Sequence, residues 1–147
     1  MIYSRSSTIL FLIYLSWGCT KLPPMETVDY VDLDRFMGRW YVIAAIPTYI
    51  EKGAHNPIEI YKKLPDGTID TTFSFNKNSF DGDLKTYSPR GFVLDSLTNA
   101  VWEMQFIWPF KADYRIIYLD EEYRHVMIGR KRRDYLWIMA RDKQMNP

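Results

Sequence analysis

A succession of short β-rich segments separated by turn signals constrains the fold of this chain more than any other feature of its sequence. Segments 58–64 and 68–75, for example, flank Pro65-Asp66-Gly67, a tight hairpin turn in which Gly67 can adopt a positive φ. No amphipathic helix of useful length separates the segments, so parallel strands joined by crossover helices are not expected. Antiparallel strands in simple succession lose their exposed edges when they close into a barrel.

The sequence therefore predicts an all-β protein, folded as an eight-stranded antiparallel up-and-down β-barrel. The expected strands are 39–46, 58–64, 68–75, 84–94, 100–108, 113–119, 123–129 and 134–141. A barrel of this size is just wide enough inside to hold one small ligand.

The composition limits the classes of function. The chain has 147 residues, enough for one domain with a core. Its formal net charge of +1 provides no general attraction for nucleic acid. Cys19 is the single cysteine, which excludes an internal disulfide and a cysteine-based zinc site, and two histidines leave little for a metal. We expect no metal, cofactor or nucleic-acid partner.

The N-terminal segment has the layout of a secretory signal. Arg5 precedes an apolar run over 9–15, and small residues precede Cys19. The run is too short to span a bilayer, which takes about 20 apolar residues. We expect a signal peptide at 1–19, a tether at 20–28 and the barrel domain at 29–147.

The cysteine at the end of this segment resembles the acylated cysteine of bacterial lipoproteins. Lipid chains on Cys19 would anchor the protein to a membrane, because each buried methylene contributes about 0.8 kcal/mol. Lys21, where an aspartate would act as a retention signal, favours the outer membrane. Plain secretion, or a location in the periplasm, and an uncleaved anchor are the alternatives.

Three segments resemble the signature motifs of the lipocalin family. They are "GRWY" at 38–41, "LDEEYRH" at 119–125 and "YLWIMAR" at 135–141. Their order and spacing agree with the strand pattern, and they look most like the branch that holds bacterial outer-membrane lipocalins, plant temperature-induced lipocalins and apolipoprotein D. The similarity covers about residues 29 to 143.

The resemblance implies structural roles at the closed end of the barrel. Trp40 would lie across that end and Arg141 would pack over it, a cation–π contact that contributes about 0.5–2 kcal/mol. Gly38, Asp120 and Tyr123 occupy the other signature positions. We expect these five residues to be structural.

Lipocalins usually continue past the last signature into a helix that packs on the barrel wall. This chain stops at Pro147, so we expect that C-terminal helix to be missing. An uncovered apolar wall favours self-association, and we therefore consider a homodimer.

Strand alternation and the resemblance together predict which side chains face the interior. If Arg141 points inward, so do Trp137 and Met139, whereas Leu136, Ile138 and Ala140 point outward. The resemblance adds inward positions on the other strands. The predicted ligand-binding residues are Tyr61, Phe73, Phe75, Lys77, Phe106, Tyr114, Trp137 and Met139, with Thr71 beside them. These side chains either line a cavity or fill a solid core.

The resemblance implies binding, storage or transport of a hydrophobic ligand, most simply a fatty acid or lysophospholipid. Up-and-down connectivity collects basic residues near the mouth, where they would face an anionic head group. They are Lys52, Lys85, Lys111, Arg115 and the run 130–133. The alternative interpretation of that run is a solvated turn.

Two other functions remain open at this point. One is a membrane-anchored interaction module with a filled barrel. The other is an enzyme built on the lipocalin fold, for which His55 and His125 are the only candidate bases among the histidines. Neither histidine has a predicted catalytic partner, so we expect no catalytic residues and no enzymatic activity.

Overall fold

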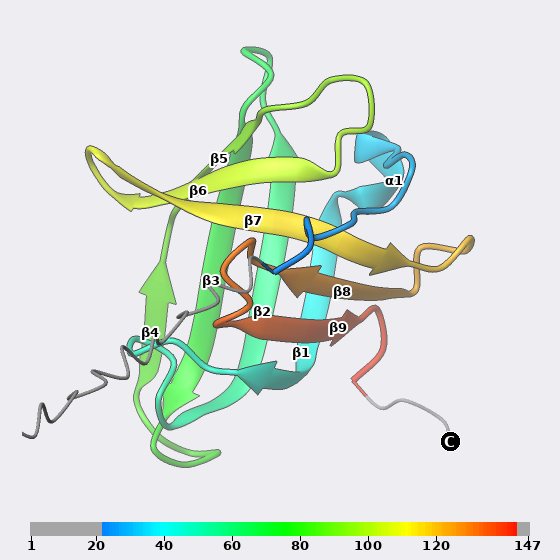
Figure 1. The fold of residues 1–147 in the computed structure, drawn as a ribbon. Helices are drawn as coiled ribbons and strands as arrows, with labels where there is room; N and C mark the ends of the chain where they lie inside the picture. The colour runs from blue at the N-terminus through cyan, green and yellow to red at the C-terminus, as the bar shows by residue number, and fades with distance from the viewer. Residues whose placement is uncertain (1–21, 144–147) are drawn as a thin grey trace, which may run out of the picture.

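The computed structural model describes residues 22–143, which form one short helix and nine β-strands (Figure 1). The predicted signal peptide, Cys19 and the last four residues lie outside the described part of the chain. The elements are α1 (Leu33–Phe36), β1 (Gly38–Ile46), β2 (Ala54–Lys63), β3 (Ile69–Lys77), β4 (Leu84–Tyr87), β5 (Arg90–Val93), β6 (Val101–Ile107), β7 (Phe110–Leu119), β8 (His125–Gly129) and β9 (Leu136–Ala140).

The strands form one closed antiparallel barrel. β1 pairs with both β2 and β9, and β2 also pairs with β3, so the sheet has no open break between its first and last strands. In Figure 1, β1 to β3 stand upright and β6 to β9 run across them. The predicted eight-stranded up-and-down β-barrel is confirmed.

The predicted segment 84–94 differs in one respect, because it is divided into β4 and β5. Both parts pair with β3, and the break falls at Ser88-Pro89. Proline has no N–H group to donate to a strand ladder, which explains why the ladder is interrupted there. β4 and β5 are therefore two halves of one barrel strand.

Helix α1 closes one end of the barrel. The Asp32 side chain caps it by accepting hydrogen bonds from the backbone N–H groups of Asp34 and Arg35. The helix ends at Phe36, and Gly38 then takes a φ of 95°, which favours glycine. The chain enters β1 directly behind this turn.

Aromatic side chains fill the closed half of the interior. Phe36 lies 5.3 Å from Trp40 and 5.4 Å from Trp102, measured between ring centroids, and Tyr61 lies 5.9 Å from Trp102. All four are fully or almost fully buried. The closed half of the barrel is a packed core.

The loops at the opposite end surround the mouth of the barrel. They are the segments 47–53, 78–83, 108–109 and 130–135. Register shifts in β1, β2 and β6 lie toward this end. Such irregularities bend strands and are common at barrel rims.

The outer wall along β9 is only partly covered. Leu136 and Ile138 are half-buried, whereas Ala140 is buried despite its predicted outward direction. The absence of a C-terminal helix and the homodimer stay predictions, since residues 144–147 are not described. No helix within residues 22–143 is long and apolar enough to cross a bilayer.

Candidate functional site

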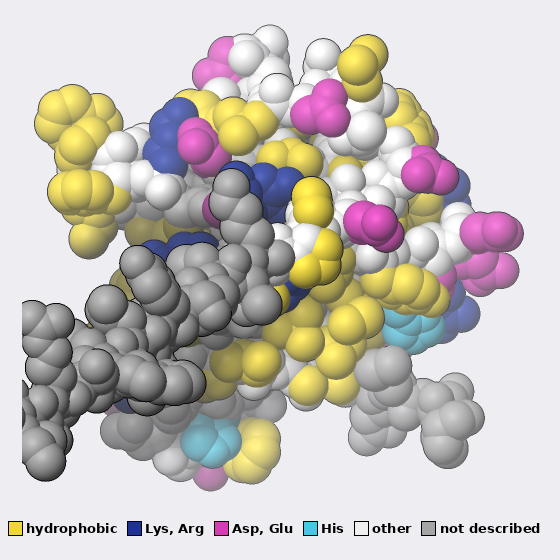
Figure 2. All heavy atoms as spheres, in the orientation of Figure 1, with side chains coloured by type: hydrophobic (Ala, Val, Ile, Leu, Met, Phe, Trp, Pro, Cys, Tyr) yellow, Lys and Arg dark blue, Asp and Glu magenta, His cyan; other side chains and the backbone are white. Residues whose placement is uncertain are grey.

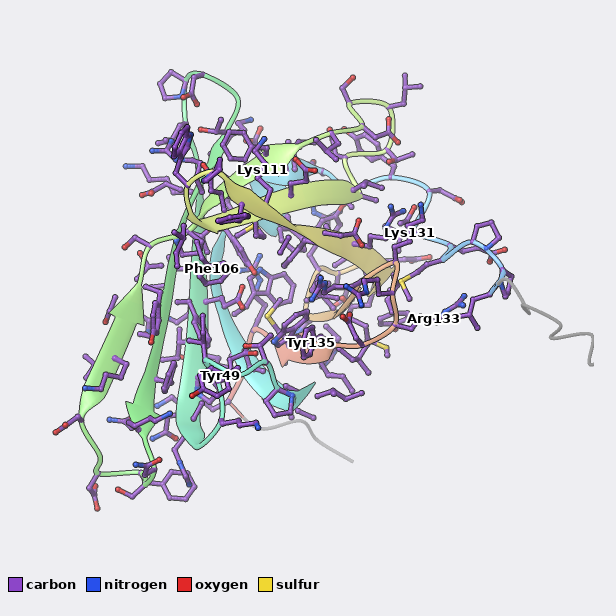
Figure 3. All side chains as sticks on the ribbon, turned by 60° about the vertical axis from the view of Figure 1, so that its left-hand side comes forward. Tyr49, Phe106, Lys111, Lys131, Arg133 and Tyr135 are labelled. Carbon is purple, nitrogen blue, oxygen red and sulfur yellow. The ribbon has the colours of Figure 1, made fainter. Side chains whose placement is uncertain are left out.

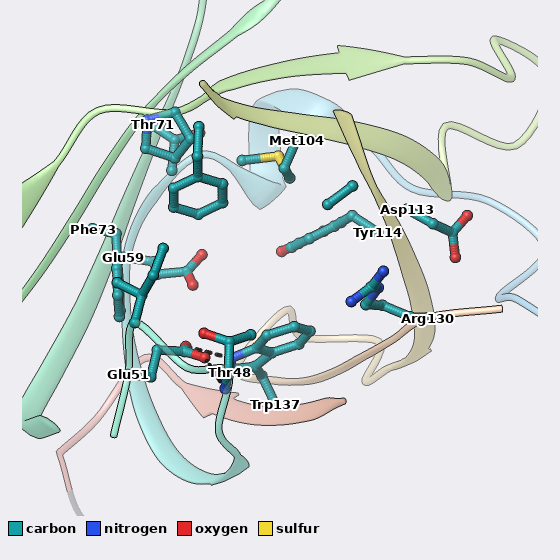
Figure 4. Close-up of a pocket in the computed structure, with 14 residues that line it drawn as sticks. Thr48, Glu51, Glu59, Thr71, Phe73, Met104, Asp113, Tyr114, Arg130 and Trp137 are labelled. Carbon is teal, nitrogen blue, oxygen red and sulfur yellow. Dashed lines mark hydrogen bonds between the residues drawn. The ribbon is translucent and has the colours of Figure 1, made fainter. Parts of the chain in front are cut away.

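The open half of the barrel contains a cavity of about 190 Å³ (Figure 4). Its walls come from several strands and from the loops at the mouth. It is lined by Thr48, Ile50, Glu51, Glu59, Thr71, Phe73, Pro89, Met104, Phe106, Ala112, Asp113, Tyr114, Arg130 and Trp137. Most of this surface is apolar or aromatic, as in sites for hydrophobic ligands. The interior is thus solid near the floor and hollow above it.

Four of the predicted ligand-binding side chains line this cavity. They are Phe73, Phe106, Tyr114 and Trp137, and Thr71 lines it as well. Each comes from a different strand except Thr71 and Phe73, which share the inward face of β3.

Tyr61, Phe75 and Met139 also have their predicted burial but do not line the cavity. Tyr61 and Met139 belong to the packed core, where aromatic rings leave no space. Phe75 is buried against Phe73, with ring centroids 5.3 Å apart. The cavity stops short of Tyr61 and Met139 because the floor is filled, whereas Phe75 is covered by Phe73 and Tyr87 nearer the mouth.

Lys77 lies elsewhere than expected. Its Nζ donates a hydrogen bond of 2.6 Å to the backbone carbonyl of Lys52, and the side chain does not line the cavity. An ammonium group is strongly hydrated, and a loop carbonyl at the rim satisfies it better than an apolar interior. The expectation of an ammonium group inside the cavity is wrong.

Glu59 is one of the cavity residues that the sequence analysis missed, and it is the one on the inward face of β2. It lies on β2 two positions before Tyr61, so strand alternation puts both side chains on the inward face. Figure 4 shows its carboxyl group directed into the cavity. A single acid at an inward position of the segment "IEIYKKL" was the signal that could have identified it.

The environment of Glu59 disfavours its charged form. The residue keeps some exposure only because it faces the cavity, while the barrel separates it from bulk water. Burial, and then the negative charge of Glu51, raise the pKa of Glu59 to about 8. Burial, followed by the effect of Glu59, also raises the pKa of Tyr114 above its ordinary value. The Tyr114 hydroxyl shares a hydrogen bond of 2.7 Å with the hydroxyl of Tyr61.

Glu51 fixes the loop 47–53 at the mouth. Its carboxylate accepts hydrogen bonds of 2.7 Å from the backbone N–H of Thr48 and from Nε1 of Trp137. The Trp137 bond is drawn in Figure 4. These two bonds hold the indole of Trp137 in place as one wall of the cavity.

Arg130 is the basic residue that reaches the cavity. Its Nη1 lies 3.5 Å from the carboxylate of Asp134, and its buried Nε has no hydrogen-bond partner among residues 22–143. Hydrogen-bond donors buried without partners are uncommon in folded proteins. Asp134 offsets part of the charge of Arg130, and the guanidinium group still lines the cavity at the mouth.

None of the other predicted rim cations lines the cavity, and several of them contact other groups. Lys111 lies 3.3 Å from Glu103 and 3.8 Å from the Phe92 ring centroid, and Arg115 bonds to Asp113. Lys52 lies in the loop 47–53, Lys85 is 3.8 Å from Asp83, and Arg133 donates to the Pro23 carbonyl. Figure 3 labels Lys111, Lys131 and Arg133 at this end of the molecule. The run 130–133 thus contributes one cavity residue.

The signature residues meet at the closed end. The Arg141 guanidinium lies 3.8 Å from the Trp40 ring centroid. It donates hydrogen bonds to the carbonyls of Arg35, Phe36, Met37, Arg39 and Tyr123. Burial lowers the pKa of Arg141. The φ of Gly38 favours glycine, whereas a Cβ atom there would lie at an ordinary contact distance of 3.4 Å from Arg141 Nη1.

Asp120 organises the turn between β7 and β8. Its carboxylate accepts hydrogen bonds from the backbone N–H groups of Arg124 and His125 and lies 3.0 Å from His125 Nδ1. Burial acts to raise its pKa, but these bonds outweigh burial and lower it. Tyr123, with a φ of 59°, accepts a bond from the Asp32 N–H through its hydroxyl.

The two histidines are far from forming a catalytic pair. His125 is bonded to Asp120 at the closed end, and His55 Nδ1 lies 3.2 Å from the Gly53 carbonyl. Neither lines the cavity. Within residues 22–143, no group of three histidine, cysteine or acidic side chains is arranged to hold a metal ion.

Comparisons with known proteins agree with this fold. The family model of the lipocalin-like domain matches residues 31–147. The chain is 33% identical to temperature-induced lipocalin-1 of Arabidopsis thaliana, over 86% of this chain and 71% of that protein. It is 30% identical to outer membrane lipoprotein Blc of Escherichia coli strain K12, over 92% of this chain and 76% of that protein.

Solved structures show the same architecture at low sequence identity. Insecticyanin from the tobacco hornworm Manduca sexta superposes with a TM-score of 0.70 at 16% identity, over 86% of this chain and 72% of that chain. Lobster apocrustacyanin A1 superposes with a TM-score of 0.59, over 77% of this chain and 64% of that chain, at 12% identity. From the family model, the relatives and the hollow barrel together, we conclude that the chain belongs to the lipocalin family, which supports binding or transport of small hydrophobic ligands rather than catalysis.

Proposed function

We propose that this protein binds fatty acids or lysophospholipids in its cavity and stores or carries them at the bacterial cell envelope. The observation that supports the proposal is an apolar cavity with one guanidinium group, that of Arg130, among the residues that line it at the mouth. An apolar chain would enter the cavity and an anionic head group would lie against Arg130. The open space also favours ligand binding over a filled-barrel interaction module.

The dimensions of the cavity favour a slender ligand. Its volume of about 190 Å³ is below the roughly 300–1,000 Å³ of pockets that enclose drug-sized molecules. A single acyl chain fits such a space and can extend past the rim, whereas a two-chain lipid is too bulky. About ten methylenes leaving water contribute ~8 kcal/mol before the costs of association, which limits the affinity to about the micromolar range.

Reversing the charge of Arg130 tests the head-group contact. We expect Arg130→Glu to weaken binding of a fluorescent fatty acid by about tenfold at low salt, because a charge-assisted hydrogen bond contributes about 1.5–3 kcal/mol. The effect should shrink at high salt, which screens charges near the surface. Fluorescence titration at two salt concentrations measures both values.

Arg132→Glu is the matched control for this titration. The Arg132 side chain is 82% exposed and does not line the cavity, although it lies two residues away. We expect this control to change the affinity by less than about twofold. An equal loss of affinity in the two variants would mean that Arg130 does not contact the head group and that net charge alone affects binding.

An exposed apolar hairpin tip supports action near a membrane. Ile107, Trp108 and Phe110, between β6 and β7, are largely exposed, and Phe106 beside them lines the cavity. Figure 2 shows the hydrophobic side chains of this tip projecting from the molecule. Exposed aromatic residues favour the interface of a bilayer. The relative named outer membrane lipoprotein Blc points to the same location, as would the predicted acylation of Cys19.

The double variant Trp108→Ser with Phe110→Ser tests the role of the tip. Burying one large apolar side chain contributes about 1.5–3 kcal/mol, so we expect at least a tenfold weaker partition into phosphatidylglycerol-containing vesicles. Leu97→Ser is the control, since Leu97 is 85% exposed on a loop at the closed end. A flotation assay with residues 22–147 measures the partition, and a loss as large in the control would contradict contact through the tip.

A further inference from the structure

The cavity contains two polar side chains without protein partners. Among the hydrogen bonds and ion pairs of residues 22–143, none involves the carboxyl group of Glu59, and the buried Thr71 Oγ1 has no partner either. Glu59 pairs with Phe73 across β2 and β3, and Tyr61 pairs with Thr71. Glu59 and Thr71 are therefore diagonal neighbours on one inward face, at a spacing that side chains can bridge.

The charges around these two groups are mainly negative. The ionisable side chains that face the cavity are Glu51, Glu59, Tyr114 and one base, Arg130, whereas the Asp113 carboxylate is directed away from the cavity and pairs with Arg115. Arg130 itself lies 3.5 Å from the carboxylate of Asp134. The deep part of the cavity therefore offers acidic groups and no cation of its own.

The aromatic side chains around Glu59 also favour binding of a cation. Phe73, Phe106, Tyr114 and Trp137 present aromatic rings to the cavity. Aromatic faces attract cations, and the attraction grows when water is excluded. A ligand carboxylate placed at this depth would be repelled by the charge of Glu51, whereas an ammonium group would be attracted by Glu51 and by the rings.

We infer that the cavity binds lipophilic primary amines, with the ammonium group held by the carboxylate of Glu59. This goes beyond the proposed function, since fatty acids and lysophospholipids would place their anionic head at Arg130. In the exchange, the protonated Glu59 releases its proton to solvent, and the incoming ammonium group replaces that proton as the partner of the carboxylate. The fold has already removed Glu59 from bulk water, so only the ligand loses hydration on binding.

The exchange of a proton for an ammonium group makes binding depend on pH. The titratable and charged groups that face Glu59 are Glu51, Tyr114 and Arg130. With the pKa of Glu59 at about 8, the affinity for an amine rises about ninefold from pH 6 to pH 7, about fivefold from pH 7 to pH 8, and then levels off. The amine itself stays protonated over this range, since alkylammonium groups such as that of lysine have a pKa of about 10.4.

Calorimetric titration with octylamine, octanol and octanoate tests the inference. We expect octylamine to bind at least tenfold more tightly than octanol at pH 8.5, and to release about 0.9 proton per amine at pH 7, measured in buffers of different ionisation enthalpy. Octanol should show no pH dependence. Equal affinity of octylamine and octanol at pH 8.5 would overturn the inference.

Two glutamate variants make the test specific. In Glu59→Gln, the preference for octylamine and the proton release should both disappear, while octanol still binds. Glu103→Gln is the matched control, because Glu103 is a strand glutamate that pairs with Lys111 outside the cavity. A preference retained in folded Glu59→Gln would also overturn the inference.

The remaining outcomes of these titrations distinguish this inference from the proposed function. If Glu59→Gln does not fold, the proton count of the unaltered protein from pH 5 to pH 8 decides, and zero release throughout this range contradicts an ammonium–Glu59 pair. Octanoate binding that depends on Arg130 but not on Glu59 supports the lipid proposal by itself. Binding of octanol without a preference for octylamine refutes only the inference about amines.

Discussion

Replacing Trp40 with alanine is expected to lower the free energy of unfolding by about 3–5 kcal/mol, the usual cost of removing a buried tryptophan. Trp40 is fully buried, lies 5.3 Å from the Phe36 ring and donates a hydrogen bond of 2.9 Å from Nε1 to the Phe36 carbonyl. Its loss would leave a cavity at the floor and remove the ring over which Arg141 lies. Urea denaturation followed by circular dichroism measures the change.

Trp108→Ala is the matched control for this measurement. Trp108 is 81% exposed at the hairpin tip, and substitutions at such positions usually change stability by no more than about 0.5 kcal/mol. A similarly small decrease in the free energy of unfolding for Trp40→Ala would mean that Trp40 does not stabilise the closed end of the barrel.

Filling the cavity is expected to remove ligand binding. Ala112 lies on β7 and lines the cavity, so Ala112→Phe would direct an aromatic ring into the space that the acyl chain needs. We expect the affinity for a fluorescent fatty acid to fall by roughly tenfold or more, which corresponds to at least about 1.4 kcal/mol. The new ring enters open space, so the destabilisation that accompanies overpacking should be small. Fluorescence titration and thermal unfolding measure the two quantities.

Thr86→Phe provides the control for Ala112→Phe. Thr86 is exposed on β4, so Thr86→Phe adds the same ring outside the barrel. Undiminished fatty-acid binding by folded Ala112→Phe would show that the ligand lies elsewhere.

Much of this fold could be predicted from the sequence because the relevant signals are local. Period-two alternation and turn residues define the strands, and antiparallel succession implies closure. The same alternation places Phe73, Tyr114 and Trp137 on the inward face, where they line the cavity. Even the break at Pro89 has a local cause in the missing N–H group.

The depth of the cavity could not be predicted in this way. It depends on contacts between residues far apart in the chain, since Phe36 from α1 meets Trp102 from β6 and fills the floor. Tyr61 and Met139 have the predicted direction but lie in that packed region. Lys77 also depends on a distant partner, the Lys52 carbonyl. The inward direction of Glu59, in contrast, could have been predicted from strand alternation alone.

Native mass spectrometry of the protein purified together with its lipids tests most directly whether the hollow interior is a lipid site. We predict one single-chain lipid bound per barrel in the unaltered protein, displaced by added lysophospholipid and absent from Ala112→Phe. Protein that carries no lipid at saturating fatty acid, or lipid retained equally by Ala112→Phe, would contradict a lipid-binding cavity.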